Sequence, residues 1–321
     1  MFRTCMVSLA LISVTAMAIA QPQPLHKTAS ASAATPYVKP APPGQLVDIG
    51  GRHLHIQCKG KPMGPVVIFE AGLSQYTAHS TYGKAQDLIA SFAQVCTYDR
   101  AGLGWSDPVA GSRTQRDMVE DLHKLVTAEG FKRPLVLVGH SLGGLLVRLY
   151  ANTYPTEVAG VVLIDATPES ILFAPGAAQA RQDILAKING ALNGAKEDVP
   201  VAPLPPGTPA EVQMAFTPSI LRTLKQEYLA IGRVPASMRK PEGYGTLGHT
   251  PLAIIRRGKT ALPPSATDKQ WRKAQEAMAS LSTCSFMVVA KHAGHVIPYE
   301  QPQVVADTVQ RMLKQLRTHH C

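Results

Sequence analysis

Short runs of Val, Ile, Leu and other apolar residues recur along the chain from about residue 45 onward, and their lengths are typical of β-strands. The expected strands are residues 47–49, 53–58, 66–69, 95–98, 135–138, 161–164, 252–255 and 286–289. The later runs are almost wholly aliphatic and do not alternate with polar residues, which is typical of parallel strands buried on both faces. These strands are therefore predicted to form the middle of one sheet.

Segments with apolar residues at helical spacing separate the strands. Met118, Leu122 and Leu125 follow this spacing, and Gly130 then ends the helix. The expected helices are residues 113–129, 141–154 and about 302–316. Because strands and helices alternate, the sequence predicts an α/β fold with a mainly parallel sheet and right-handed crossovers.

The interval between the strands at 161–164 and 252–255 is far longer than an ordinary connection. It contains two expected helical stretches, 179–192 and 209–231, on either side of a proline-rich joint. We interpret about residues 168–249 as a helical cap inserted into a single domain of residues 45–321. The apolar cap residues form either an acyl pocket or the core of the cap; they are Ile171, Leu172, Phe173, Met214 and Phe216.

The amino terminus has the pattern of an export signal. Arg3 precedes an apolar run, and Ala18-Ile19-Ala20 form a small-x-small cleavage site. The run is shorter than the roughly 20 residues that span a bilayer, so a cleaved signal over residues 1–20 is favoured over a membrane anchor. Residues 21–44 are rich in Pro, Ala and Ser and are predicted to be a flexible lead-in. The mature protein is expected in the periplasm or outside the cell.

Composition and charge restrict the range of functions. Of 321 residues, 45% are hydrophobic and 17% charged, a balance that favours a packed core over disorder. The formal net charge is +10, but Lys and Arg are dispersed and no nucleic-acid-binding motif is present. We therefore expect a basic surface, no nucleic-acid partner and no stable membrane span.

The cysteines agree with an oxidising compartment. Removal of Cys5 with the signal leaves Cys58, Cys96, Cys284 and Cys321. An even number of cysteines in an exported protein predicts disulfides, and four residues allow three pairings. Four free, buried thiols are the alternative.

The segment 139–143 reads Gly-His-Ser-Leu-Gly and lies between an expected strand and an expected helix. In that setting Gly-x-Ser-x-Gly forms a strained turn that lifts the serine hydroxyl into a cleft. Ser141 is therefore the candidate nucleophile. The amide of Leu142, at the start of the helix, is a candidate donor to an oxyanion.

A serine nucleophile needs a base, and His295 is the best candidate. It lies in the loop between the last strand and the last helix, at the carboxyl edge of the sheet where sites collect. His140 is expected to point away and pack, and His292 to be a surface neighbour. His53 and His55 lie on one face of an early strand, where packing is favoured over a metal site.

Two carboxylates could orient the histidine. Asp165 ends the strand after Ser141, while Asp268 follows the next strand at some distance. Asp165 is preferred because a carboxylate at the end of a buried strand is costly unless it is paired; Asp268, or no acid at all, is the alternative. The turn at 70–74 supplies a second oxyanion candidate, the amide of Leu73, with Gly72 permitting the turn and Ser74 as its neighbour.

From about residue 45 onward the chain resembles the α/β-hydrolase family. The likeness is carried by Glu-Ala-Gly-Leu at 70–73, Tyr-Asp-Arg-Ala-Gly-Leu-Gly-Trp-Ser-Asp at 98–107, Gly-His-Ser-Leu-Gly-Gly at 139–144 and Ala-Gly-His at 293–295. The resemblance implies an eight-stranded sheet with an antiparallel second strand, a cap after the sixth strand and a Ser-Asp-His triad. By the family's strand order it also implies disulfides Cys58–Cys96 and, less directly, Cys284–Cys321.

The chain departs from many relatives in two places. Relatives often carry His-Gly at the oxyanion turn, where this chain has Ala71-Gly72, and often place the acid after the seventh strand rather than the sixth. In such proteins the segment around Asp99 and Arg100 is usually architectural, and it is not counted as catalytic.

The motifs favour a serine hydrolase that cleaves a small-molecule carboxylic ester through an acyl-enzyme, with no cofactor and no metal. Hydrolysis of an amide or peptide, a lactone or a carbon–carbon bond, and acyl transfer, use the same residues and stay open. A relative that binds a ligand without turnover is the alternative from another class. The sequence leaves the oligomeric state open.

Overall fold

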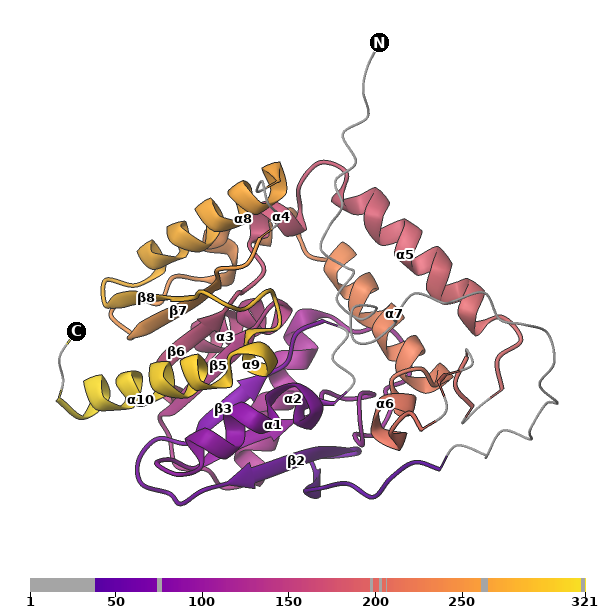
Figure 1. Ribbon diagram of the computed structural model, residues 1–321, viewed down its shortest axis with the longest axis horizontal. Coiled ribbons are helices and arrows are strands. Elements are labelled where there is room, and N and C mark those ends of the chain that lie inside the picture. Colours follow the sequence, from indigo (N-terminus) through magenta and orange to yellow (C-terminus); the bar gives the residue numbers. More distant parts are fainter. Residues whose placement is uncertain are drawn as a thin grey trace, which may run out of the picture.

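The computed structural model describes residues 38–73, 77–196, 199–201, 204–205, 207–260, 265–318 and 321. One eight-stranded sheet has the order β1-β2-β4-β3-β5-β6-β7-β8 (Figure 1). The strands are β1 Gln45–Asp48, β2 His53–Lys59, β3 Val67–Glu70, β4 Val95–Tyr98, β5 Leu135–His140, β6 Val158–Ile164, β7 Leu252–Arg257 and β8 Ser285–Ala290. Only β2 runs antiparallel to its neighbours β1 and β4, and the remaining pairs are parallel. The predicted fold class and the antiparallel second strand are confirmed.

Pairing with neighbouring strands, rather than local composition, sets where the strands end. The sixth strand was expected from residue 161 but begins at Val158, which pairs with Leu135 of β5. The second strand continues to Lys59, which pairs with Val95 of β4. The added residues lie outside the apolar runs of the sequence, so the apolar pattern alone underestimates the length of both strands.

Helices cover both faces of the sheet. The longer helices of this layer are α1 Ala78–Ile89, α2 Gln115–Ala128, α3 Leu142–Thr153, α8 Ala266–Ala277 and α10 Pro302–Thr318. The shorter ones are α9 Ile297–Glu300, η1 Pro155–Glu157 and η4 Met278–Leu281. Residues alternate along the strands, so that Val136 and Val138 pack with α1 and α10 while Leu135 and Leu137 pack with α2 and α3.

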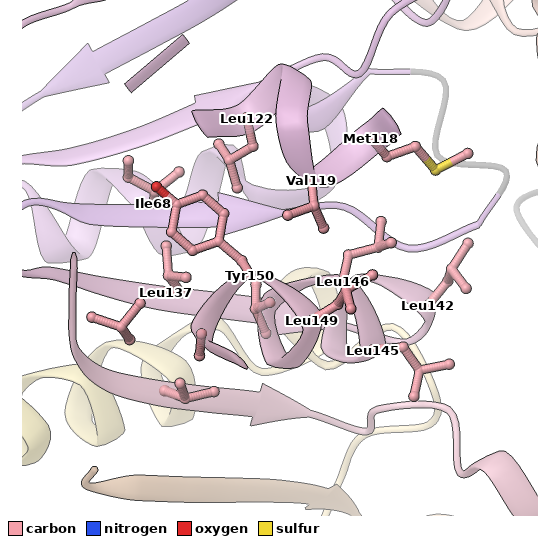
Figure 2. Close-up of a cluster of buried hydrophobic side chains, with 14 of the residues drawn as sticks. Ile68, Met118, Val119, Leu122, Leu137, Leu142, Leu145, Leu146, Leu149 and Tyr150 are labelled. Atoms are coloured by element: carbon pink, nitrogen blue, oxygen red, sulfur yellow. The ribbon is translucent and has the colours of Figure 1, made fainter. Parts of the chain in front are cut away.

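Helix α3 is held firmly against the sheet. Figure 2 shows Leu145 and Leu149 of α3 in a cluster with Leu137 of β5 and Leu122 of α2. These side chains are fully or almost fully buried, and each contributes roughly 1.5–3 kcal/mol relative to exposure. The packing fixes the amino terminus of α3, which directly follows Ser141.

Residues 168–249, here called the cap segment, lie between β6 and β7. They contain α4 Glu169–Leu172, α5 Ala177–Leu192, α6 Ala210–Met214, α7 Pro218–Gly232, η2 Ala236–Met238 and η3 Pro241–Tyr244. Helices α5 and α7 pack against each other (Figure 1). The stretch expected as one helix at 209–231 is two helices, because Pro218 has no amide hydrogen to continue α6 and instead opens α7.

Helix α8 was not expected from the sequence, although Ser265 and Asp268 form a reciprocal capping box at its start.

The predicted signal over residues 1–20 and most of the predicted lead-in lie outside the described residues. Within the described part of the chain, no helix combines the length and apolarity needed to cross a bilayer.

Two disulfides lie in opposite halves of the sheet. Cys58 and Cys96 face each other across the antiparallel pair β2 and β4, and Cys284, just before β8, is bonded to Cys321 beyond α10. The pairing implied by the family resemblance is thus confirmed. The bonded residues are 38 and 37 positions apart in the chain.

Because the two loops are nearly equal in length, loss of either disulfide should release a similar entropy in the unfolded chain. We expect Cys58→Ala/Cys96→Ala and Cys284→Ala/Cys321→Ala each to lower the free energy of unfolding by about 2–4 kcal/mol. Urea titration of both variants and of the oxidised wild type measures the change. Variants as stable as the oxidised wild type would contradict the expectation.

Candidate active site

Ser141 occupies the turn between β5 and α3, where the backbone changes direction sharply. Its φ of 52° and ψ of −120° lie outside the regions that non-glycine residues ordinarily adopt. A Cβ on Gly139 would overlap the backbone of Gly143, and one on Gly143 would overlap the carbonyl of Glu70. The glycines therefore let strand, turn and helix approach closely, and the strained turn presents Ser141 Oγ at the carboxyl edge of the sheet.

His295 lies in the loop between β8 and α9 and contacts both other predicted triad residues. Its Nε2 is 2.9 Å from Ser141 Oγ, and its Nδ1 is 2.7 Å from Asp165 Oδ2. An ionised carboxylate only accepts hydrogen bonds, so Nδ1 carries the hydrogen and Nε2 presents its lone pair to the serine hydroxyl. This geometry suits removal of the hydroxyl proton by His295.

Asp165 is completely buried at the end of β6, with a φ of 39°. Besides His295, it accepts hydrogen bonds from Trp271 Nε1 at 3.0 Å and Arg257 Nη1 at 2.8 Å. Burial alone would raise the pKa of the Asp165 carboxyl, but the hydrogen bond from His295, the electrostatic interaction with that ring and the positive charge of Arg257 hold that pKa below its usual value. The carboxylate is therefore ionised and fixed in orientation.

Asp268, the alternative acid, has other partners. It accepts hydrogen bonds from the amide and hydroxyl of Ser265 at the start of α8, and it lies 3.4 Å from Arg257 Nη2. Arg257 thus stands between the two carboxylates, with its guanidinium 4.6 Å from the centre of the Trp271 ring. The structure brings Asp165 to His295 and gives Asp268 a capping role.

The two predicted oxyanion donors lie on opposite sides of Ser141 in the chain. Leu142 is the first residue of α3, where amide hydrogens have no partner within the helix. Leu73 follows β3, and the amide of Gly72 beside it donates to Tyr82 Oη at 3.2 Å. Gly72 is thereby engaged, and within the described part of the chain no partner competes for the Leu73 amide. Ser74, its expected neighbour, lies outside the described residues.

His140 does more than pack. It is buried, and its Nε2 donates to the backbone carbonyl of His295 at 2.8 Å, with the two rings 4.8 Å apart. Burial, followed by the electrostatic interaction with the neighbouring His295 ring, lowers the pKa of His140 to about 3. The side chain is therefore neutral and holds the loop that carries His295.

Thr167, which no motif singled out, has its hydroxyl 3.2 Å from Ser141 Oγ. The three other histidines that the sequence singled out lie elsewhere: His53 pairs with Asp107, His55 pairs with Asp99, and His292 is exposed. Thr167, Arg257 and Trp271 were not predicted, because no motif marks them and only the folded structure shows that they contact the site.

Comparisons with known proteins bear on the family and the fold of the chain. The sequence model described as "Alpha/beta hydrolase family" matches residues 71–308. The uncharacterized protein YqjL of Bacillus subtilis is 24% identical over 257 residues, which cover 80% of this chain and 87% of YqjL.

Two solved structures share the fold. A putative lipase (lip1) from Acinetobacter baumannii superposes with a TM-score of 0.64 at 16% identity, covering 86% of this chain and 92% of the lipase. A thermophilic esterase from Thermogutta terrifontis gives 0.58 at 18% identity, covering 88% and 98%. At such identities the likeness supports the fold alone.

The buried, neutral His140 should make stability depend on pH. Below about pH 6.5 the unfolded chain binds a proton at this histidine that the native state excludes until about pH 3. The free energy of unfolding therefore falls as the pH drops through this window, by up to ~1.4 kcal/mol per pH unit from His140 alone.

Urea titrations of wild type and His140→Gln between pH 7 and pH 4.5 measure this contribution. We expect the stability of the wild type relative to the variant to fall steadily as the pH is lowered. His292→Gln, at an exposed position, is the control for the loss of a histidine. A difference between wild type and His140→Gln that does not change with pH would rule out this origin.

Proposed function

The chain belongs to the alpha/beta hydrolase family, and on that premise we propose that it is a serine hydrolase that cleaves carboxylic esters through an acyl-enzyme on Ser141. The observation that carries the proposal is the hydrogen-bonded series from Ser141 Oγ to His295 Nε2, at 2.9 Å, and from His295 Nδ1 to Asp165 Oδ2, at 2.7 Å. Nucleophile, base and orienting acid stand in the order that acyl transfer requires.

In the first half of the reaction, His295 Nε2 takes the proton from Ser141 Oγ as that oxygen attacks the ester carbonyl carbon. The carbonyl oxygen becomes an oxyanion, which accepts hydrogen bonds from the amides of Leu142 and Leu73. The imidazolium then gives its proton to the leaving alcohol, and the acyl group stays on Ser141. Water, deprotonated by His295, attacks the acyl-enzyme, and the acid leaves as Ser141 regains its proton.

Asp165 keeps His295 in the tautomer that this cycle needs and stabilises the imidazolium. Its hydrogen bonds from Trp271 and Arg257 fix the carboxylate, so it cannot turn away from Nδ1. No protonation of Asp165 is required, and its depressed pKa favours the ionised form throughout.

The ester bond is preferred over amide and carbon–carbon bonds because an ester carbonyl is more electrophilic than an amide carbonyl and its alcohol is the better leaving group. The same residues serve amide or peptide, lactone and carbon–carbon bond hydrolysis and acyl transfer, and a ligand-binding relative without turnover remains a second candidate. The substrate is proposed to be a small-molecule ester or acyl compound. Most candidates for an acyl pocket are ordinary core: Met214, for example, packs with Leu103, Trp105 and Ile220.

We also propose that the protein works outside the cytoplasm. Two disulfides suit an oxidising compartment. The signal pattern over residues 1–20 supplies the route.

Covalent labelling tests the nucleophile. A fluorophosphonate should label the wild type and Ser280→Ala, a control at an exposed serine, but not Ser141→Ala, because only an activated serine attacks phosphorus. Labelling is read by intact mass.

Turnover should follow the same pattern. On p-nitrophenyl esters of rising chain length, Ser141→Ala should lower kcat by at least ~10⁴-fold. A p-nitroanilide peptide measured beside the esters tests the bond: a higher kcat/KM for the anilide would reject the ester proposal. Labelling of Ser141 with no turnover on any of these compounds would favour the ligand-binding alternative.

Two isosteric variants decide between the acids. Asp165→Asn should lower kcat by ~10³–10⁴-fold, since an amide cannot hold His295 in the required tautomer. Asp268→Asn weakens the capping box of α8 and removes the carboxylate charge beside Arg257, and it should keep kcat within about ten-fold, with a fall in thermal midpoint. The reverse ranking of kcat would make Asp268 the acid.

A further inference from the structure

Arg100 is the second residue after β4 and is 2% exposed. Its guanidinium contacts two regions that are far apart in the sequence. Toward the turn after β3, Nη1 lies 2.8 Å from Glu70 Oε1 and 2.5 Å from the carbonyl oxygen of Ala71, while Nη2 donates to the carbonyl of Gly72 at 2.8 Å. Toward helix α7 of the cap segment, Nε and Nη2 bind the two carboxylate oxygens of Glu227 at 2.7 and 3.0 Å.

The bond to the Gly72 carbonyl fixes the direction of the Leu73 amide. The C=O of Gly72 and the N–H of Leu73 belong to one planar, trans peptide group, so they point in opposite directions. With the carbonyl held on Arg100, the N–H is held facing away from it. The positive charge of the guanidinium beside the carbonyl oxygen also polarises the peptide group, which strengthens its N–H as a donor.

The cap segment is fixed to the same arginine. Glu227 is 3% exposed and comes from α7, and close packing supports the contact, since a Cβ on Gly102 would overlap Thr223 one turn earlier in that helix. Burial opposes a charge on Arg100, but Glu227 and Glu70 raise the pKa of Arg100, so the guanidinium stays charged. A displacement of α7 would therefore displace the Arg100 guanidinium, which orients the turn at residues 71–73.

We propose that Arg100 is a positioning residue for the oxyanion donor Leu73, and that Glu227 makes this positioning depend on the seating of the cap segment. The inference rests on the proposed serine hydrolase function. Arg100 lies in the segment that the family resemblance marks as architectural. Under this proposal it affects the reaction because it orients the oxyanion turn. Full activity then requires α7 to be docked.

A second buried ion pair offers a matched control. Arg148 of α3 binds Glu169 of α4 at 2.5 Å and the carbonyl of Gly245 at 3.3 Å, so it joins the two ends of the cap segment to the main domain. Glu169 is 2% exposed, close to the value for Glu227. Replacing either glutamate removes a buried cap anchor, but only Glu227 is linked to the turn at 71–73.

The experiment compares Glu227→Ala with Glu169→Ala on the p-nitrophenyl ester that the wild type turns over fastest. Glu227→Ala should lower kcat ten-fold or more with KM within three-fold, because the oxyanion forms only as the reaction proceeds. It should weaken inhibition by an alkyl trifluoromethyl ketone, whose hemiketal oxyanion needs the same donors, by the same factor. Glu227→Gln keeps an acceptor for Arg100 Nε and should restore part of kcat.

Glu169→Ala should lower the thermal midpoint as much as Glu227→Ala while keeping kcat and ketone inhibition within three-fold of wild type. The proposal is overturned if folded Glu227→Ala keeps wild-type kcat and ketone inhibition, or if Glu169→Ala loses as much of both. If Glu227→Ala does not fold, Glu227→Gln is compared with Glu169→Gln: Glu227→Gln should lose more kcat and more ketone inhibition, and equal losses in the two variants would overturn the proposal. A wild type that neither labels at Ser141 nor turns over esters would refute the proposed function instead.

Discussion

The free-energy cost of burying a carboxylate shapes this site. Asp165 has no exposed surface, so it must be compensated by donors, and the fold supplies them from three separate segments: His295 after β8, Arg257 at the end of β7 and Trp271 in α8. Each donor fixes one part of the chain relative to the others. Satisfying this one charge therefore also sets the position and tautomer of the histidine that faces Ser141.

The parts of the site that are local in sequence could be predicted, and those that depend on distant segments could not. Ser141 could be identified because the strand, the glycine turn and the helix are contiguous in the sequence. Asp165 and His295 could be predicted because they lie just after the strands β6 and β8. After the seventh strand the sequence indicated only that no acid is present, and nothing in it predicted that Arg257 binds Asp165. The capping box of Ser265 and Asp268 was readable in the sequence and would have assigned Asp268 to the start of a helix.

Two buried arginines extend the same principle to the cap segment. Arg100 and Arg148 are each nearly inaccessible, and each is neutralised by a glutamate of that segment, Glu227 or Glu169. A buried guanidinium that loses its partner is costly, so these pairs restrict where the cap segment can sit. Sequence could not reveal them, since their partners are many residues away and carry no motif.

The proposed reaction passes through an ester bond between the acyl group and Ser141. Rapid quenching of a reaction with p-nitrophenyl pivalate, whose bulky acyl group slows the attack of water, followed by peptide mass analysis, tests for this intermediate. We expect a burst of p-nitrophenolate close to one equivalent of active protein, with the pivaloyl mass on Ser141. Continued release of p-nitrophenolate with no pivaloyl adduct, or with the adduct on another residue, would contradict it.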